Sequence, residues 1–141
     1  MGKRYGTWKR KFKDASGEEK ELYYACSRRG NVTDFDGLAE IITEISSLSK
    51  GDILSSLTNI EQVMLWKLID GDSVRFGDIG TFSIAVTSDG FENPEDITPD
   101  KVRATKIVFT PTKKFNKLLL EMKFTNYDKR LRKALGKRYS K

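Results

Sequence analysis

The sequence predicts an α+β fold, because a stretch with helical periodicity is followed by a stretch in which apolar and polar residues alternate. Apolar residues recur every three to four positions between residues 33 and 69, a spacing typical of amphipathic helices. Period-two alternation runs from residue 73 to residue 109 and is typical of β-strands. A further helical pattern follows over residues 112–122, and the 141-residue chain is long enough for one compact domain.

The first thirty residues predict two short strands before the first helix. Residues 5–12 mix aromatic side chains with cations, residues 21–27 are rich in aromatic residues, and residues 14–18 have the composition of a turn. The aromatic side chains fit two roles, a stacking platform for single-stranded bases or the cover of one edge of the fold. These side chains are Trp8, Phe12, Tyr23 and Tyr24.

Two helices are predicted next. Thr33 is followed three residues later by Asp36, a capping-box arrangement, so we expect Thr33 to be the N-cap of the first helix. Ser49 and Asp52 repeat this start signal for a second helix, which we expect to end at residues 70–72. Apolar residues cover more than half of its circumference, whereas a surface helix needs a stripe of about 100°. We therefore expect it to be buried on two sides, against its neighbour and against something else, such as a second copy of the chain.

A three-stranded β element and a closing helix complete the predicted fold. Gly77 and Gly80 lie between the first two strands, where we expect positive φ angles to permit a tight turn or a bulge. Pro111 is expected in the first turn of the closing helix, where its missing N–H is no loss. Beyond that helix, the sequence is compatible with a short basic helix over residues 126–135 and equally with a disordered segment.

The composition excludes several kinds of chemistry. The chain has no His, which removes Ser-His and Cys-His nucleophile pairs, His acid–base catalysis and His metal ligation. Its one cysteine, Cys26, cannot form an internal disulfide or build a thiolate zinc site alone. Because no Gly-rich phosphate loop is present either, we expect no enzyme, cofactor, metal or small-molecule substrate. With no apolar stretch near the roughly 18 residues of a membrane span and no secretory signal, we expect a soluble, cytoplasmic protein without a membrane partner.

The net charge of +6 is distributed unevenly along the chain. Residues 1–30 carry +5, residues 31–112 carry −8, and residues 113–141 carry +9. Two cationic ends around an acidic middle fit a polyanionic partner, nucleic acid first and an anionic membrane surface second. They equally fit basic ends that only keep the protein soluble.

Three blocks of sequence resemble the HU/IHF family of histone-like bacterial DNA-binding proteins. Residues 48–52 (Leu-Ser-Lys-Gly-Asp) resemble the turn between the family's first two helices. Residues 75–82 (Arg-Phe-Gly-Asp-Ile-Gly-Thr-Phe) resemble the glycine-bracketed start of its sheet, and residues 109–115 (Phe-Thr-Pro-Thr-Lys-Lys-Phe) the start of its last helix. The resemblance covers about residues 33–122, and the strands before them resemble a longer, HU-related branch of the family.

The resemblance implies an HU/IHF-like intertwined homodimer with a helix-turn-helix pair, a three-stranded antiparallel sheet with a long β-arm, and a C-terminal helix. The chain would then divide into an N-terminal β extension (1–32), an HU-like DNA-binding domain (33–122, arm 83–108) and a basic C-terminal tail (123–141). In the family, paired arms reach into the minor groove of double-stranded DNA. A proline near each arm tip wedges between base steps and bends the duplex.

The resemblance also implies which residues contact DNA. They lie at the arm root, on the returning strand, at the start of the last helix and at the arm tip. They are Arg75, Lys101, Arg103, Lys106, Lys113, Lys114, Lys117, Asn93 and Pro94. The three lysines of the last helix are expected near its N-terminus, where free N–H groups bind phosphate, with an ordinary solvated face as the alternative. Pro94 fits a wedge and a plain turn proline equally.

The expected arm tip departs from the family in its charge. Glu92 stands where the family has a cation before the Asn-Pro pair, and residues 89–100 hold five acidic and no basic residues. Because like charges near phosphates oppose binding, we expect the affinity to come from the arm root, the last helix and the basic ends.

The leading hypothesis is therefore a non-catalytic, largely sequence-independent DNA-binding protein of the nucleoid. One alternative is an interaction module that keeps the dimeric fold and uses its acidic arms to bind a protein partner. Another is RNA binding through the aromatic strands and the basic tail.

Overall fold

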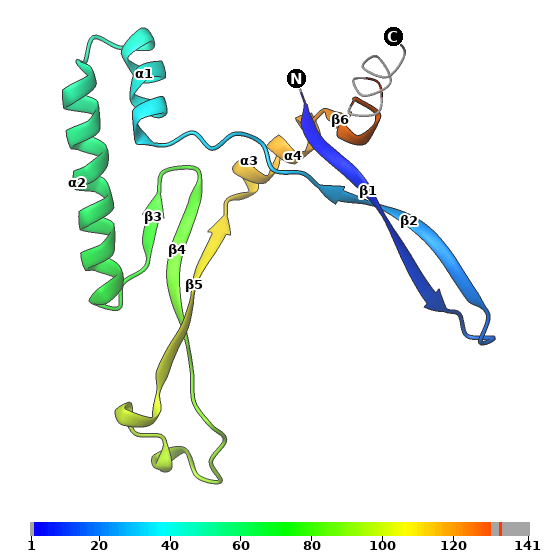
Figure 1. Cartoon of the computed structure of the whole chain (residues 1–141). Helices are drawn as coiled ribbons and strands as arrows, with labels where there is room; N and C mark the ends of the chain where they lie inside the picture. The colour runs from blue at the N-terminus through cyan, green and yellow to red at the C-terminus, as the bar shows by residue number, and fades with distance from the viewer. Residues whose placement is uncertain (1, 131–132, 134–141) are drawn as a thin grey trace. The chain divides into compact units, whose positions relative to one another are not determined.

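The computed structural model describes residues 2–130 and residue 133, and the chain divides into two compact units. One unit is Thr33–Leu118, and the other joins Met1–Val32 to Leu119–Lys141. Helices and strands follow one another in separate runs along the chain (Figure 1), which confirms the predicted α+β class.

Two helices open the first unit, α1 (Phe35–Ile45) and α2 (Lys50–Ile69). The predicted start of α2 is confirmed, since the Ser49 hydroxyl accepts the N–H of Asp52 at 3.2 Å and donates to the Asp52 carboxylate at 2.6 Å. The C-cap of α2 is Asp70, followed by a glycine at φ +90°, which confirms the predicted end.

The N-cap of α1 differs from the prediction by one residue. Asp34, not Thr33, caps the helix, because its carboxylate accepts the N–H of Gly37 at 3.0 Å. A carboxylate is a stronger acceptor than a hydroxyl and is also favoured by the positive end of the helix dipole, so Asp34 displaces its neighbour from this role.

The sheet of this unit consists of β3 (Val74–Phe76), β4 (Gly80–Thr87) and β5 (Arg103–Pro111), in the order β3-β4-β5. All of its pairs are antiparallel, as predicted. The long connection between β4 and β5 contains two 3-10 turns, η1 (Pro94–Asp96) and η2 (Pro99–Lys101), which Figure 1 shows at the far end of the arm.

The closing helical segment consists of two short helices, α3 (Lys113–Asn116) and α4 (Leu118–Glu121). The prediction that Pro111 lies in the first helical turn is wrong, because Pro111 is the last residue of β5 and lies opposite Gly80. A proline is tolerated there since β5 is an edge strand of the sheet. Thr112 is the N-cap instead, and its hydroxyl accepts the N–H of Phe115 at 3.1 Å.

The two glycines at the connection from β3 to β4 have different roles. Gly77 adopts φ +52°, which confirms the expected positive angle. For Gly80 that expectation is wrong, because its φ angle is not positive. Glycine is needed there for its small size. A Cβ atom at Gly80 would lie 2.5 Å from the Thr110 carbonyl oxygen and 2.6 Å from the Phe109 ring.

The second unit is built on a long hairpin of β1 (Lys3–Lys13) and β2 (Glu19–Ser27), which confirms the two predicted strands. A strand that was not predicted, β6 (Phe124–Asn126), pairs in parallel with the start of β1, giving the order β2-β1-β6. Residues 127–130 are helical, and most of the remaining positions of the predicted helix 126–135 lie outside the described residues.

The hairpin turn is fixed by Asp14. Its carboxylate accepts the N–H groups of Ser16 and Glu18 and forms an ion pair with Lys20 at 2.8 Å. The hydrogen bonds from Lys20 and then from Ser16 lower the pKa of Asp14 to about 2, so the carboxylate stays charged at neutral pH.

Large apolar side chains are mostly exposed. Among the described residues, the buried apolar ones are Ala39 and Ile53. Trp66 and Ile69 on α2 are 57% and 74% exposed, so the second covered side expected for this helix stays a prediction. No helix in the described part of the chain is long and apolar enough to cross a membrane.

Replacing Gly80 with Ala should destabilise the fold by about 2 kcal/mol, because the added methyl group meets backbone that cannot move freely. Denaturant unfolding followed by circular dichroism measures this change. Gly51→Ala is the matched control, since the nearest atom to its Cβ would be 3.9 Å away. We expect Gly51→Ala to leave stability unchanged or raise it by up to about 1 kcal/mol. Equal stabilities of the two variants would contradict the steric role of Gly80.

Candidate nucleic-acid interface

The sheet β3–β4–β5 has one apolar and one polar face. Residues directly opposite each other in an antiparallel pair share a face, and residues two apart on a strand do so too. The apolar face is formed by Val74, Phe82, Ile84, Val86, Ile107 and Phe109. The rings of Phe82 and Phe109 lie 4.9 Å apart there. The end of α2 lies on this side, because a cavity of about 570 Å³ is lined by Leu65, Leu68 and Ile69 together with Ile84, Val86, Ala104 and Ile107.

The opposite face is polar and carries three of the predicted DNA-binding cations. Its β4 residues are Thr81, Ser83, Ala85 and Thr87. Arg75 lies opposite Thr81, Lys106 opposite Ala85, and Arg103 opposite Thr87. We call this surface the polar arm face.

A β-bulge brings Arg103 and Lys106 onto this common face. The two residues are three positions apart on β5, so in a regular strand they would point to opposite faces. The register shifts between Ala85 and Val86, so that Thr105 is the extra residue of β5. The hydroxyl of Thr105 donates to the carbonyl of Ala85 at 3.1 Å and so holds the irregular pair together. Sequence reasoning missed this residue, because no glycine or proline marks the bulge.

The three cations of the polar arm face differ in their surroundings. The Arg75 Nε donates to the Gly77 carbonyl at 3.1 Å, which orients the guanidinium at the arm root. Arg103 lies 3.5 Å from the Asp89 carboxylate, and both side chains are largely exposed. The Lys106 ammonium makes no hydrogen bond or ion pair with any described residue, so its charge is available to a ligand.

The arm tip uses its own cation internally. Lys101 belongs to η2, not to the returning strand, and its ammonium donates to the Asp96 carbonyl at 2.9 Å. The same ammonium lies 4.8 Å from the centre of the Phe91 ring, a cation–π contact. Asn93 is the N-cap of η1 and Pro94 its first residue, and both are exposed.

The lysines at the start of the last helix are close together in sequence but unequal in their contacts. Lys113 and Lys114 form the first turn of α3, and Lys117 follows its last residue. Lys114 is paired with Asp78 at 2.8 Å. A single turn has little of the aligned dipole that favours anions at the ends of longer helices. This region therefore offers exposed lysine charge to a polyanion, and phosphate contact by these lysines stays a prediction.

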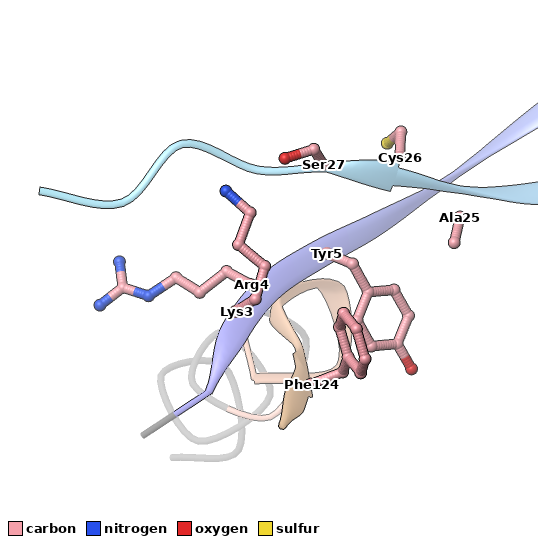
Figure 2. A pocket seen from close by; sticks show the side chains of 7 residues that line it. All are labelled: Lys3, Arg4, Tyr5, Ala25, Cys26, Ser27 and Phe124. Atoms are coloured by element: carbon pink, nitrogen blue, oxygen red, sulfur yellow. The ribbon is translucent and has the colours of Figure 1, made fainter. Parts of the chain in front are cut away.

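A hollow of about 580 Å³ lies in the other unit, where β6 joins β1 (Figure 2). Tyr5, Ala25, Cys26 and Phe124 line it, and the side chains of Lys3 and Arg4 extend away from the two rings (Figure 2). None of the predicted DNA-binding residues lines this hollow. In the described part of the chain, no group of three or more His, Cys, Asp or Glu residues is placed to hold a metal ion.

Comparison with known proteins identifies the family. A family model described as HU-HIG, an HU domain fused to a wHTH, Ig or glycine-rich motif, matches residues 1–126. The chain belongs to the HU-HIG family. The expected HU-like family is thereby confirmed, and the match includes β1, β2 and β6 as well as the arm-bearing unit. A search of curated proteins gave no match.

A solved structure with the same fold comes from Bacteroides vulgatus ATCC 8482 and is described as a "Putative bacterial DNA binding protein". Its TM-score is 0.55 and its sequence identity is 10%, with 89% of the HU-HIG chain covered. The chain spans about half of that protein, since the match covers 48% of it.

Inserting one Thr between Ala85 and Val86 should lower the affinity for duplex DNA about tenfold. The inserted residue would lie opposite Thr105, remove the bulge, and leave Arg103 and Lys106 on opposite faces. Fluorescence anisotropy with a random-sequence duplex measures the change.

Deleting Thr105 is the matched control, because it also removes the bulge but keeps Arg103 opposite Thr87 and Lys106 opposite Ala85. We expect this deletion to change the affinity less than threefold. Equal losses in the two variants would show that the common face of the two cations is unimportant.

Proposed function

We propose that the chain binds double-stranded DNA without catalysis and largely independently of sequence, as a histone-like protein of the nucleoid in the cytoplasm. The polar arm face is the observation that carries the proposal, because it aligns Arg75, Lys106 and Arg103 on one side of the sheet. Membership of the HU-HIG family supports it, as does the shared fold with a protein described as DNA-binding.

The chemistry of the polar arm face fits phosphate contact. Arginine and lysine side chains neutralise phosphates whatever the base sequence, and the small hydroxyl residues between them can donate to phosphate oxygens. Lys113 and Lys117, which have no ion-pair partner among the described residues, add charge beyond the end of β5. The basic ends of the chain extend the same cationic character in sequence.

A second copy of the chain is part of this proposal. The apolar face of the sheet and the outer side of α2 leave large side chains such as Trp66, Ile69 and Ile107 more than half exposed. A monomeric protein rarely leaves so much contiguous apolar surface open to water. Covering these surfaces with a second copy leaves both polar arm faces free for DNA and doubles the number of cations in one particle.

The arm tip has a minor role in this proposal. Its five carboxylates repel phosphates, and two nearby cations, Lys101 and Arg103, already interact with groups of the tip. Binding by Asn93 and wedging by Pro94 stay predictions. The acidic tip favours a second candidate function, docking of a basic protein partner on the arms.

A salt titration tests the proposed function. If about six phosphates are neutralised, the logarithm of the affinity for random duplex DNA should fall against the logarithm of the salt concentration with a slope near −5. Fluorescence anisotropy of the labelled duplex gives this slope. No binding at low salt would contradict the proposal and favour the protein-partner function.

Three variants show which residues produce the slope. Lys106→Ala should make the salt slope less negative by about 1 for each phosphate that this ammonium neutralises in the native chain. Lys67→Ala is the control, because Lys67 lies on α2 and is paired with Asp72 at 3.3 Å. The slope of this variant should equal that of the native chain. Pro94→Ala removes no charge, so weaker binding with an unchanged slope would assign a wedge role to Pro94.

A further inference from the structure

The hairpin β1–β2 presents a row of aromatic and cationic side chains that duplex binding does not use. The register places Trp8 opposite Tyr24 and Arg10 opposite Leu22, with Phe12 two residues further along β1. These five side chains therefore lie on one side of the hairpin, which we call the aromatic face. In the described part of this unit, β6 pairs only with Lys3–Tyr5.

The rings of the aromatic face are open to water and close to one another. Trp8 and Tyr24 are 48% and 41% exposed, and their ring centres lie 6.0 Å apart at an angle of 43°. A hollow of about 250 Å³ next to this pair is lined by Arg10, Phe12 and Tyr24. Two aromatic positions, with a guanidinium between them, thus lie along one strand over about 13 Å.

The two sides of the hairpin also differ in how their cations are paired. On the opposite side, Lys9 and Lys11 both pair with Glu21, at 2.5 and 3.4 Å. The hydrogen bond from Lys9 lowers the pKa of Glu21, so the carboxylate stays charged and partly compensates the two lysines. On the aromatic face the strands contribute no carboxylate. Lys20, opposite Phe12, pairs with Asp14 of the turn at 2.8 Å, whereas Arg10 makes no ion pair with any described residue.

The end of the hairpin next to β6 is closed on the aromatic face. A Cβ at Gly6 would lie 2.5 Å from the Arg28 guanidinium, so the Arg28 side chain crosses the strand at this position. Arg28 is held there by an ion pair with Asp128 at 3.7 Å. The accessible surface therefore begins at Trp8 and continues toward the turn.

We propose that the aromatic face binds single-stranded DNA. One base stacks on the Trp8–Tyr24 pair, a second enters the hollow beside Phe12, and Arg10 binds the phosphate between them. Stacking needs only the flat surface of a base, so the site should accept any sequence. The choice of DNA over RNA rests on the proposed duplex binding by the other unit. The stacking geometry is independent of that proposal.

Tryptophan fluorescence tests this site directly in the full chain. The chain has two tryptophans, so Trp66→Phe leaves Trp8 as the only one. Adding the oligonucleotide dT12 should quench Trp8 fluorescence in a saturable way. An unchanged Trp8 signal at dT12 concentrations that saturate binding would overturn the proposal.

Variants on the two sides of the hairpin locate the binding. By anisotropy of labelled dT12, Tyr24→Ala should weaken binding about tenfold and Arg10→Gln several-fold. Tyr23→Ala is the matched control, because Tyr23 is 69% exposed on the opposite side, and it should change the affinity less than twofold. Equal losses for Tyr23→Ala and Tyr24→Ala would overturn the proposal. Arg10→Gln retains every ring. If Tyr24→Ala loses its strand signal in circular dichroism, the dT12 affinity of Arg10→Gln tests the site instead.

Two further comparisons separate single-strand binding by the aromatic face from duplex binding, RNA binding and self-association. Tyr24→Ala should leave the affinity for duplex DNA unchanged, so a failure of duplex binding and a failure of this site are distinguishable. Tighter binding of rU12 than of dT12 would overturn the assignment to DNA. Loss of self-association in Tyr24→Ala, with dT12 binding unchanged, would instead identify the aromatic face as a contact between protein chains.

Discussion

Burial of the apolar side of the sheet β3–β4–β5 is the constraint on which the proposed assembly of the arm-bearing unit depends. Burial of one large apolar side chain stabilises a fold by about 1.5–3 kcal/mol, yet in the described part of a single chain only Ala39 and Ile53 are apolar and buried. The proposed association through α2 and the apolar sheet face would bury side chains that a single chain leaves exposed. Strand alternation, together with the bulge at Thr105, places Arg75, Arg103 and Lys106 on the other side.

In the proposed function, this division gives separate surfaces to assembly and to DNA binding. The polar arm face owes its charge to ordinary alternation at Arg75 and to the bulge at Thr105, which brings Arg103 and Lys106 to one side. The hairpin of the other unit repeats this separation, with ion-paired lysines on one side and the Trp8–Tyr24 ring pair on the other. In both units, a strand's two-residue period separates the chemistry of one face from that of the next.

Local signals were readable in the sequence, and pairing between distant segments was not. Ser49 and Asp52 cap α2 through contacts three residues apart, so their sequence pattern is sufficient. By contrast, β6 exists because Phe124–Asn126 pairs with a strand more than a hundred residues earlier. The need for a small residue at Gly80 and the position of Pro111 at the end of β5 likewise depend on strand register. The cations of the candidate site were named from the family resemblance, but their common face depends on the bulge, which no residue pattern marks.

Denaturant unfolding at two protein concentrations tests most directly whether a second copy covers the apolar side. If folding and association are linked, the urea midpoint should rise with concentration, because mass action favours the associated state. A hundredfold increase corresponds to about 2.7 kcal/mol, which is a shift of about 1 M urea for a typical dependence on denaturant. A midpoint that is the same at both concentrations would show that the single chain is stable without a cover.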